Sequence, residues 1–462
     1  MEIMAIILAA GKGTRMKSTT HKVLHPVCGK PMIGHILDQL EEVNVQRLVT
    51  VVGHEADKVK EYVGERSEFV VQEQLLGTGH AVKQVEPLLG QQTGLTIVVN
   101  SDMPLLTAAS IQSMLHHHVC CHAAATVLTA IVDDPTGYGR IVRDHNGNVE
   151  KIVEQKDCTP SETEIKEINT GIFCFDNEKL FAALKELKNN NKQNEYYLTD
   201  VMEIMRNRGE SIQAFTLQNK NEAQGVNDRV QLAEVERLMR KGIITKHMVN
   251  GVTIIDPSSV YIDQDVVIGQ DTLLYPNTYL YGASVIGEGC TIGPNTEIKD
   301  SVIGKHVEIK QSTIAGANIG NDTVVGPFAY IRPGTELASK AQVGRFVEVK
   351  NTYIGEGSKL PHLSYVGDAQ IGKGVNIGCG VITANYDGVN KHRTTIEDEA
   401  FIGSNSNLIA PIHIGKGAYV VAGSTCTKDV KEEEMAIARA RQTNKEGYAK
   451  KYKKRASVKK EK

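Results

Sequence analysis

The sequence has no long hydrophobic run, no C-x-x-C pair among its cysteines and little excess of charge of either sign. None of its apolar stretches approaches the about 18–20 continuous residues that cross a bilayer, so we expect no membrane insertion. The 8 cysteines contain no C-x-x-C pair, which favours reduced thiols in the cytoplasm over a disulfide framework. A formal net charge of -3 over 462 residues argues against a general nucleic-acid-binding protein, so any anion site must be local.

The first half of the chain alternates apolar, strand-like runs with helical patterns. Its first apolar run, Ile3–Leu8, lacks the basic leader of a signal peptide, and we interpret it as a buried strand. We expect buried strands over Ala5–Ala9, Leu48–Val52 and Thr96–Val99, and helices over Met32–Glu42, Ala81–Leu89 and Ala108–Cys121. This βαβ order predicts a doubly wound α/β (Rossmann-like) domain over residues 1–229, with ligands at the carboxyl ends of its strands.

In the second half, an aliphatic residue recurs at every sixth position. The series runs through Ile268, Leu274, Leu280, Ile286, Ile292 and Ile298, then Ile319, Val325, Ile331, Leu337, Val343 and Val349, and finally Ile396, Ile402, Leu408, Ile414 and Val420. This period is typical of a parallel β-helix, in which each coil has three short faces and one aliphatic side chain per face points inward. We therefore predict a left-handed β-helix of hexapeptide repeats over residues 251–462. Shorter steps, such as Ile298 to Ile303 and Val349 to Ile354, would shorten individual coils.

Three segments depart from these two patterns. Residues 230–250 place apolar side chains at helical spacing between charges, which predicts a connecting helix. Ile382–Ile396 interrupts the hexapeptide rhythm, and a loop inserted into a β-helix is a frequent place for function. The repeats stop after Lys431, and the strongly basic end of the chain, GYAKKYKKRASVKKEK, predicts a disordered, solvated tail.

The loop after the first strand, LAAGKGTRM, has the composition of a phosphate-binding turn. It lacks the spacing of a Walker A loop, and Met16 occupies the place where a dinucleotide fingerprint needs a small residue. What remains is a glycine turn with free N–H groups and the guanidinium of Arg15 nearby, which suits a polyphosphate. An ordinary strand-to-helix turn explains this stretch, taken alone, equally well.

The longer segment LAAGKGTRMKSTTHKVLHPVCGKPMI closely resembles the signature of sugar-phosphate nucleotidyltransferases. With the hexapeptide repeats added, essentially the whole chain is similar to the bifunctional bacterial N-acetylglucosamine-1-phosphate uridyltransferases/glucosamine-1-phosphate acetyltransferases. The resemblance implies two reactions. Acetyl-CoA would acetylate glucosamine 1-phosphate, and UTP would then convert N-acetylglucosamine 1-phosphate into UDP-N-acetylglucosamine, a precursor of cell-wall peptidoglycan and related glycans, with release of pyrophosphate.

The same resemblance implies roles for individual residues of the first half. It places Leu8, Ala9, Ala10, Gly11, Lys22 and Asn227 at the nucleotide, Gln72, Gly77 and Thr78 at the uracil, and Gly139, Glu154 and Asn169 at the sugar. Asp102 and Asn227 match the ligands of a Mg²⁺ ion, for which carboxylate and amide oxygens are suitable donors. Lys22 and Arg15 would stabilise the charge that develops on the phosphates. An amide such as Gln72, together with backbone groups, complements the N3–H donor and carbonyl acceptors of uracil.

Two functions are open for the β-helix: a second enzyme, or a structural or regulatory module attached to a single nucleotidyltransferase. Arg332 and Lys350 are separated by three hexapeptides, one coil, so they should stack on one face and clamp a phosphate together. His362 follows nearby and is suited to accept a proton at neutral pH, although a lone histidine on a coil is more often a surface residue. A zinc site with histidines five apart is disfavoured, because the position five after His362 is Gly367.

The resemblance favours the second enzyme, with His362 as its general base. It implies contacts to glucosamine 1-phosphate from Arg332, Lys350, Tyr365 and Asn376, and contacts to acetyl-CoA from Cys379, Asn385, Tyr386, Ser404, Ala422 and Arg439. Cys379 stands where relatives commonly have alanine. The resemblance also implies a homotrimer with sites between neighbouring β-helices, whereas the residue pattern alone permits a monomer.

Two further segments suggest no additional function. The run HHHVCCH, His116–His122, has spacings too tight for a tetrahedral zinc loop, and we expect it to be structural or solvent-facing. The segment DHNGNVE predicts a hairpin with an Asn-Gly turn.

Overall fold

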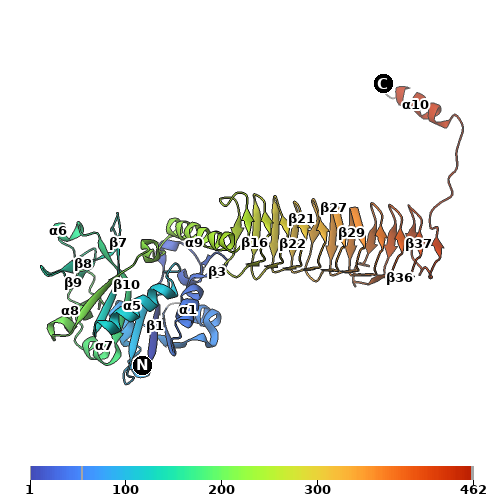
Figure 1. Ribbon diagram of the computed structural model, residues 1–462. Helices are drawn as coiled ribbons and strands as arrows, with labels where there is room; N and C mark the ends of the chain where they lie inside the picture. The colour runs from blue at the N-terminus through green and yellow to red at the C-terminus, as the bar shows by residue number, and fades with distance from the viewer. Residues whose placement is uncertain (1, 54–55, 459–462) are drawn as a thin grey trace. The chain divides into compact units, whose positions relative to one another are not determined.

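The computed structural model describes residues 2–53 and 56–458. The chain divides into two compact units, Met1–Ile243 and Ile244–Lys462, and helix α9 (Arg229–Val249) contains the point of division. Figure 1 shows a helix-covered sheet in the first unit and a stack of coils in the second.

A mixed β-sheet with helices on both faces makes up the first unit. Its strands are β1 (Ile3–Ala9), β4 (Arg47–Val52), β5 (Glu68–Val71), β6 (Leu95–Asn100), β7 (Ala125–Ile131), β8 (Gly139–Arg143), β9 (Val149–Val153), β10 (Glu167–Asp176) and β11 (Ile212–Thr216), beside the small pair β2 (Pro26–Val27) and β3 (Lys30–Pro31). The helices are α1 (Met32–Glu42), α2 (Ala56–Val63), α3 (Thr78–Lys83), α4 (Glu86–Leu89), α5 (Ala108–Cys120), α6 (Pro160–Thr163), α7 (Asn177–Leu184) and α8 (Asp200–Asn207).

The order of strands across this sheet is β11-β7-β10-β6-β1-β4-β5. Strands β6, β1, β4 and β5 are parallel, as the βαβ pattern predicted, but β10 runs antiparallel to both of its neighbours. The chain passes from β1 to β4 on one side and returns to β6 on the other. In α/β sheets a reversal of this kind opens a crevice at the carboxyl ends of the strands.

Strand β1 is buried on both faces because its side chains alternate between two hydrophobic clusters. Ala5 and Ile7 pack with residues of α1, α2 and α5, whereas Met4 and Ile6 pack with residues of α3, α7 and α8. All four side chains have no exposed surface. A continuous apolar run is what a central parallel strand requires, and each large side chain buried in this way stabilises the fold by about 1.5–3 kcal/mol.

Most of the expected elements of this unit are confirmed, and one is wrong. The helix expected over Ala81–Leu89 is divided, because α3 ends at Lys83 and α4 begins at Glu86. Pro87 stands in the first turn of α4, where the N–H that proline lacks is not needed, and further inside one continuous helix it would remove a hydrogen bond. The predicted hairpin is confirmed, since β8 and β9 pair antiparallel around the Asn-Gly turn.

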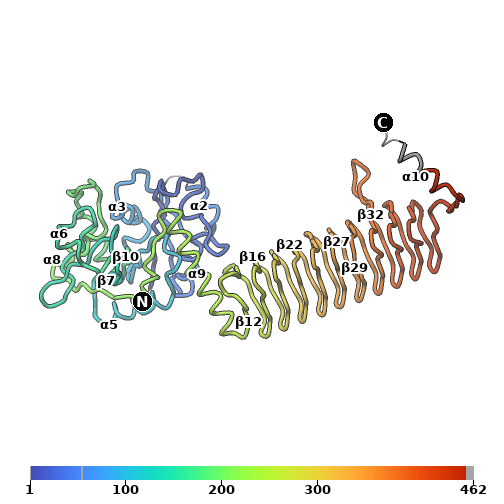
Figure 2. The backbone as a smooth tube through the Cα atoms, turned by 90° about the horizontal axis from the view of Figure 1, so that it is seen from above, coloured from blue at the N-terminus to red at the C-terminus, as the bar shows by residue number. Residues whose placement is uncertain are grey.

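A left-handed parallel β-helix forms the second unit, and Figure 2 shows its coils. One continuous sheet contains β12 (Thr253–Ile254), β13 (Tyr261–Ile262), β15 (Leu273–Leu274), β16 (Thr278–Tyr281), β18 (Thr291–Ile292), β19 (Thr296–Lys299), β21 (Glu308–Ile309), β22 (Thr313–Ala315), β24 (Val324–Val325), β25 (Tyr330–Ile331), β27 (Gln342–Lys350), β29 (Lys359–Gly367), β31 (Asn376–Ile377), β32 (Ile382–Ala384), β34 (Phe401–Ile402), β35 (Asn407–Ile409), β37 (Tyr419–Val420), β38 (Thr425–Cys426) and β39 (Met435–Ala436). The other sheet contains β14 (Val267–Ile268), β17 (Val285–Ile286), β20 (Val302–Ile303), β23 (Asn318–Ile319), β26 (Glu336–Leu337), β28 (Tyr353–Ile354), β30 (Ala369–Ile371), β33 (Thr394–Ile396) and β36 (Ile412–Ile414).

The register between coils explains the hexapeptide period. Ile268 pairs with Ile286 after one coil of three hexapeptides, and Ile286 pairs with Ile303 after a coil that is one position shorter. The predicted short steps therefore do shorten single coils. Every aliphatic residue of the predicted series is buried, so the series forms the core of the prism.

The interruption of the repeats is a loop between β32 and β33, residues 385–393, which projects from the coils in Figure 2. Ile371 pairs with Ile396, at a separation longer than one regular coil, and the extra residues form this loop, inside which Tyr386 and Lys391 make an antiparallel bridge. Two expectations for the end of the chain are wrong. Strand β39 continues the coils beyond Lys431, and α10 (Tyr448–Val458) takes up most of the segment expected to be disordered, whose last residues, 459–462, lie outside the described part of the chain. Alanine, lysine and arginine are strong helix formers, which accounts for α10.

Candidate active sites

A cleft opens at the carboxyl ends of β1 and β6, where the strand order reverses. The loop that follows β1 turns through Gly13, whose φ of 59° places it in the left-handed region. A side chain at Gly13 would have its Cβ 2.5 Å from the Cβ of Lys22. Glycine is therefore required here for both its backbone conformation and its contact with Lys22. A Cβ at Gly11 would meet nothing within 4 Å, so this part of the loop is open to a ligand.

Two oxygen atoms converge on the ammonium group of Lys22. The Lys22 Nζ lies 2.5 Å from Asp102 Oδ2 and 2.8 Å from Asn227 Oδ1, although the three residues are far apart in the sequence. Arg15 Nη2 donates to the same Asn227 oxygen at 2.9 Å. The structure thus brings together the four residues that the sequence associated with phosphate and metal. The donor set, one carboxylate and one amide oxygen directed at a shared cation, fits a hard divalent ion such as Mg²⁺.

One end of the cleft, with a volume of 280 Å³, contains the residues predicted to hold the base and most of those predicted at the phosphates. Gln72 follows β5 and is 4% exposed, and Thr78 begins α3. Gly77, between them, has a φ of 106°, and a Cβ there would lie 2.6 Å from the carbonyl oxygen of Tyr196. This pocket is lined by Leu8, Ala9, Ala10, Gly11, Lys22, Gln72, Gly77, Thr78 and Asp102, among others. All the residues predicted to hold the uracil, and most of those predicted at the nucleotide, are therefore in one place.

The other end of the cleft, with a volume of 430 Å³, contains the residues predicted to hold a sugar. It is lined by Gly139, Glu154 and Asn169 together with Arg15 and Asn227. Leu8, Thr78 and Asp102 line both ends, so the two pockets form one continuous cleft with Asp102 at the junction.

The sugar end of the cleft contains a largely buried carboxyl group, that of Glu154, close to other acidic side chains. Burial raises the pKa of this carboxyl, and the nearby Asp200, Asp157 and Glu195 add to the effect, although Thr199 donates a hydrogen bond to Glu154 Oε1 at 3.4 Å. Burial and Glu203 likewise raise the pKa of Asp200 to about 6. A carboxylate in such surroundings gains most from a ligand hydroxyl that donates to it.

On the β-helix, three cationic side chains come together. Arg332 and Lys350 follow the paired residues Ile331 and Val349 on adjacent coils, as their spacing predicted. Lys391, from the loop at 385–393, lies beside Lys350 and lowers the pKa of that ammonium. Among Arg332, Lys350 and Lys391, all within the described residues, only Arg332 has an ion pair with a carboxylate: its Nη1 lies 2.7 Å from Glu348 Oε1. A cluster of like charges of this kind is suited to bind an anion such as a phosphate.

The residue predicted as general base begins a column of small side chains. His362, on β29, lies in register with Arg345 on β27, and its neighbours on later coils follow from the paired strands. His362, Cys379, Ser404 and Ala422 occupy the same position on successive coils, one residue per coil. Three hydrogen bonds fix this alignment: Gly380 N to Leu363 O, Asn405 N to Cys379 O and Gly423 N to Ser404 O.

This column, defined here as His362, Cys379, Ser404 and Ala422, ends near a cation. A Cβ on Gly423 would lie 3.8 Å from Cδ of Arg439, so the arginine stands next to the last column residue. Adjacent strands are about 4.8 Å apart, which puts Ala422 about 14 Å from His362. An extended ligand lying along the column would have one end at the histidine and the other at the guanidinium.

The other residues predicted to bind substrates on the β-helix differ in their position relative to the cationic side chains and the column. Tyr365 lies on β29 near Arg332, whose pKa is raised mainly by Glu348 and to a small extent by Tyr365. Asn376 lies on β31, in register with Lys359 rather than with Tyr365. The Nδ2 of Asn385 donates to Asp368 Oδ2 at 2.5 Å, so its amide is already bound within the coils. Tyr386 is 61% exposed on the projecting loop.

The histidine and cysteine run at 116–122 has no metal-binding arrangement. His118 is buried and its Nδ1 lies 2.8 Å from Thr126 Oγ1, while His117 packs on the ring of Phe215. Across residues 2–53 and 56–458, no group of three or more histidine, cysteine, aspartate or glutamate side chains is placed to hold a metal ion. In the same residues, no helix combines the length and the apolar character needed to cross a membrane.

Comparison with known proteins gives matches in both units. The nucleotidyl transferase family matches residues 4–222, and the bacterial transferase hexapeptide (six repeats) family matches residues 265–300. A "Bifunctional protein GlmU" from Geobacillus sp. (strain WCH70) is 56% identical over 96% of this chain and 97% of that protein. The chain belongs to the GlmU family. Members from Exiguobacterium sp. and Listeria welshimeri are 54% and 51% identical, over 97% and 96% of this chain and 100% and 98% of theirs.

Membership in the GlmU family confirms the resemblance seen in the sequence and the bifunctional enzyme expected from it. The chain joins a nucleotidyltransferase half to a hexapeptide-repeat acetyltransferase half, and the β-helix is therefore more than a scaffold.

Sequence reasoning missed several residues that line these sites or contact the residues that do. Thr199 donates to Glu154, His80 contacts Gln72, and Lys391 joins Arg332 and Lys350. Lys391 lies inside the interruption of the hexapeptide rhythm, which was the available signal for it. Thr199 and His80 carry no such signal, since only the packing of α3 and α8 against the sheet brings Thr199 to the cleft and His80 beside Gln72.

Proposed function

We propose that the cleft of the first half transfers the uridylyl group of UTP to N-acetylglucosamine 1-phosphate, and that the β-helix transfers acetyl from acetyl-CoA to the amine of glucosamine 1-phosphate. The working units would be residues 1–229 and 251–462, joined by the helix at 230–250. One observation carries the first assignment. The base-reading residues, the cation-binding residues and the sugar-binding residues line one cleft in the order base, phosphate, sugar.

In the first reaction, the phosphate oxygen of the sugar attacks the α-phosphorus of UTP and pyrophosphate leaves. The loop at Gly11 and the pocket around Gln72 and Thr78 hold the nucleotide, while Glu154 and Asn169 orient the sugar. Lys22 and Arg15 stand where negative charge increases on the phosphates, and such preorganised charges are effective because they need no rearrangement during the reaction. The protein forms no covalent bond to the substrate in this scheme.

Asp102 and Asn227 would hold a Mg²⁺ ion at this cleft. When bound, such an ion supplies positive charge to the phosphate oxygens of the nucleotide. Their oxygens already converge on a cation, the ammonium of Lys22, which supports the assignment.

In the second reaction, the amine nitrogen of glucosamine 1-phosphate attacks the thioester carbonyl of acetyl-CoA. A C–N bond forms, the C–S bond breaks, and the coenzyme leaves as its thiol. His362 would accept the proton that the amine loses. Arg332, Lys350 and Lys391 would bind the sugar phosphate, with Tyr365 and Asn376 nearby. The acyl donor would lie along the column toward Arg439, and Asn385 and Tyr386 would contact it from the loop.

We also propose that the chain forms a homotrimer through its β-helix. Phe328, Phe346 and Leu363 stack at one corner of successive coils, and they are 52%, 60% and 60% exposed. Each has a φ between 33° and 62°, a conformation that costs a bulky residue about 1–3 kcal/mol. An exposed apolar ridge of this kind fits a contact with another chain beside His362. The mass of the assembly in solution, from light scattering, tests the state directly.

The whole proposal is tested by supplying glucosamine 1-phosphate, acetyl-CoA and UTP to the purified chain and following all products in time. We expect N-acetylglucosamine 1-phosphate first and UDP-N-acetylglucosamine with pyrophosphate afterwards. If UDP-N-acetylglucosamine forms only when acetylated sugar phosphate is supplied, the acetyltransferase assignment is wrong and the β-helix serves another purpose. Product from cytidine or adenosine triphosphate in preference to UTP would contradict the assignment of the first cleft.

We expect the KM for N-acetylglucosamine 1-phosphate to depend on pH through Glu154. Because the pKa of Glu154 is raised, its ionised form, the better acceptor for a sugar hydroxyl, is lost at a higher pH than for an ordinary glutamate. The KM should therefore increase as pH falls toward 5, while kcat changes less. Glu154→Gln should raise the KM by about tenfold at pH 8 and flatten its pH dependence. Equal pH profiles for both proteins would rule out this role, because titration of the substrate phosphate is common to the two.

A further inference from the structure

The carboxamide of Gln72 is held in one orientation by two acceptors. Its Nε2 donates to the carbonyl oxygen of Gly77 at 3.1 Å and lies 3.0 Å from Nδ1 of His80. A carbonyl oxygen only accepts, so the contact with Gly77 identifies the nitrogen end of the amide. Both contacts therefore use Nε2, and the oxygen end is left for a ligand in the cleft that Gln72 lines.

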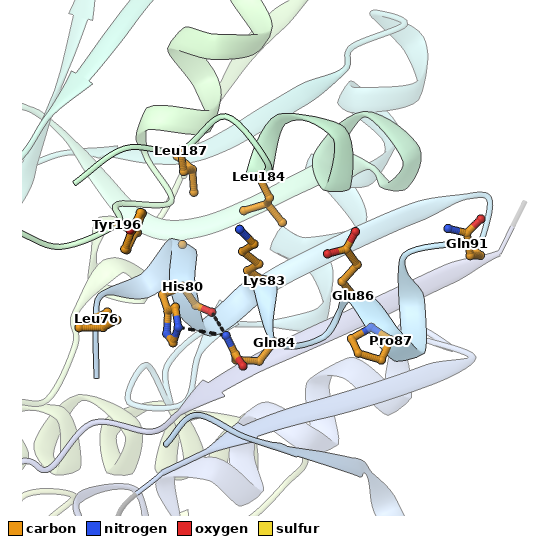
Figure 3. Close-up of a pocket in the computed structure, with 11 residues that line it drawn as sticks. Leu76, His80, Lys83, Gln84, Glu86, Pro87, Gln91, Leu184, Leu187 and Tyr196 are labelled. Atoms are coloured by element: carbon orange, nitrogen blue, oxygen red, sulfur yellow. Dashed lines mark hydrogen bonds between the residues drawn. The ribbon is translucent and has the colours of Figure 1, made fainter. Parts of the chain in front are cut away.

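This arrangement determines the protonation of His80. Since Gln72 Nε2 donates, Nδ1 of His80 must accept, and the ring is neutral with its hydrogen on Nε2. The amide of Gln84 lies against that other nitrogen, at 3.1 Å, and also lies 3.2 Å from the carbonyl oxygen of His80, as Figure 3 shows. A neutral ring accepts at only one nitrogen, so the two glutamine amides cannot both donate to it. Gln72 is 4% exposed whereas Gln84 is half-buried, so Gln84 is the amide that turns over: it gives up its bond to the His80 carbonyl, and its oxygen accepts from Nε2–H. An imidazolium, in contrast, would oppose Gln72.

The surroundings of His80 favour the neutral ring. Burial lowers its pKa, and the ammonium of Lys83 on the same helix lowers it further. The pocket on which His80 opens also contains Glu86 and Tyr196, whose ring centre lies 6.3 Å from that of His80 (Figure 3). The acceptor that Gln72 needs is therefore present at neutral pH.

We propose that His80 is a positioning residue that keeps the oxygen of the Gln72 amide toward the base and thereby sets the preference for uracil over cytosine. The inference rests on the proposed role of Gln72 at the uracil. An amide oxygen accepts from N3–H of uracil, whereas N3 of cytosine is itself an acceptor and would face that oxygen without a hydrogen. If the amide turned over, its NH₂ group would suit cytosine instead. Two similar bases are distinguished best by the unpaired polar groups in the wrong complex.

Three substitutions at position 80 separate this role from simple packing. His80→Asn keeps an acceptor near the place of Nδ1, His80→Gln keeps one near the place of Nε2, and His80→Phe keeps a ring with no acceptor. The quantity measured is the ratio of kcat/KM for UTP to that for CTP, with N-acetylglucosamine 1-phosphate as the second substrate. We expect His80→Phe and His80→Gln to lower this ratio by about tenfold and His80→Asn to retain most of it. The loss is partial because Gly77 still holds the amide.

Two controls make the outcomes distinct. Gln84→Ala removes only the contact on the far side of the ring and should leave the ratio unchanged, and acetyl transfer by the other half reports intact protein. An unchanged ratio in His80→Phe, or equal losses in His80→Phe and His80→Asn, overturns the proposal. Gln72→Leu tests the underlying assignment. If it leaves the ratio unchanged, Gln72 does not read the base, and the role of His80 is lost with it.

Discussion

Replacing His362 with alanine is expected to lower acetyl transfer to glucosamine 1-phosphate by a factor of about 10²–10⁴ while uridyl transfer stays unchanged. The histidine stands at the exposed corner of β29, at the start of the column along which the acyl donor would lie. Arg332 and Lys350 lie on neighbouring coils and would hold the phosphate of the acceptor sugar nearby. The amine must lose a proton as it attacks, and His362 is the group placed to accept it.

A matched control is available on the same β-helix. His413 is also outside the core, but its Nε2 lies 3.0 Å from Glu397 Oε1, on a different sheet from the column. His413→Ala should retain acetyl transfer. The decisive measurement is the single-turnover rate with saturating acetyl-CoA, because it reports the chemical step rather than binding. If His362→Ala stays within threefold of the unmodified protein, another group is the base.

Replacing Lys22 with glutamine should lower uridyl transfer by a factor of about 10²–10³ and leave acetyl transfer unaffected. The side chain of Lys22 lines the base and phosphate pocket and is 13% exposed, and its ammonium contacts both Asp102, at the junction with the sugar pocket, and Asn227. Its charge would be opposite the phosphates at the moment when pyrophosphate leaves. The effect should appear in kcat and in the reverse reaction from pyrophosphate, with little change in the KM for UTP.

The same substitution has a second, opposite effect that can be measured. Lys22 now occupies the point on which the Asp102 and Asn227 oxygens converge, so it competes with a divalent ion for them. In Lys22→Gln, the Mg²⁺ concentration for half-maximal activity should fall although the rate itself falls, and Mn²⁺ binding followed by electron paramagnetic resonance should tighten. Lys30→Gln is the control, since Lys30 pairs with Asp38 at 2.7 Å and does not line the cleft. A loss of rate equal in both variants would exclude the specific role of Lys22.

The parts of this protein that repeat could be predicted from the sequence in detail. The aliphatic series from Ile268 to Val420 was enough to predict the β-helix, and a spacing of three hexapeptides was enough to stack Arg332 on Lys350, because a regular coil converts sequence distance directly into position. In the first unit, the sequence predicted individual strands but not how they pair. Strands β1, β4 and β6 could be recognised, but the antiparallel direction of β10 depends on how distant segments pair.

The contacts inside the cleft, too, could not be predicted from spacing in the sequence. Asp102 and Asn227 are far apart in the chain, and no spacing rule connects them, so only the family resemblance suggested that they act together. His80 looks like any polar residue of a short helix until α3 is packed beside Gln72. The division between α3 and α4 was missed because the apolar spacing from Ala81 to Leu89 continues through Pro87, and the tail was misjudged because its charge was given more weight than its helix-forming residues.

The column of His362, Cys379, Ser404 and Ala422 has a consequence for the size of the acyl donor. Each coil adds one residue and about 4.8 Å, so the number of coils between the histidine and Arg439 sets the reach of the site. A donor much shorter than this span, such as acetyl phosphate, would meet the base without reaching the arginine, whereas a coenzyme with a long pantetheine arm would reach both. Removing one whole coil would preserve the core and the fold but bring the two ends closer by one fixed step. The length of acyl donor that can reach both His362 and Arg439 therefore changes in steps of one coil.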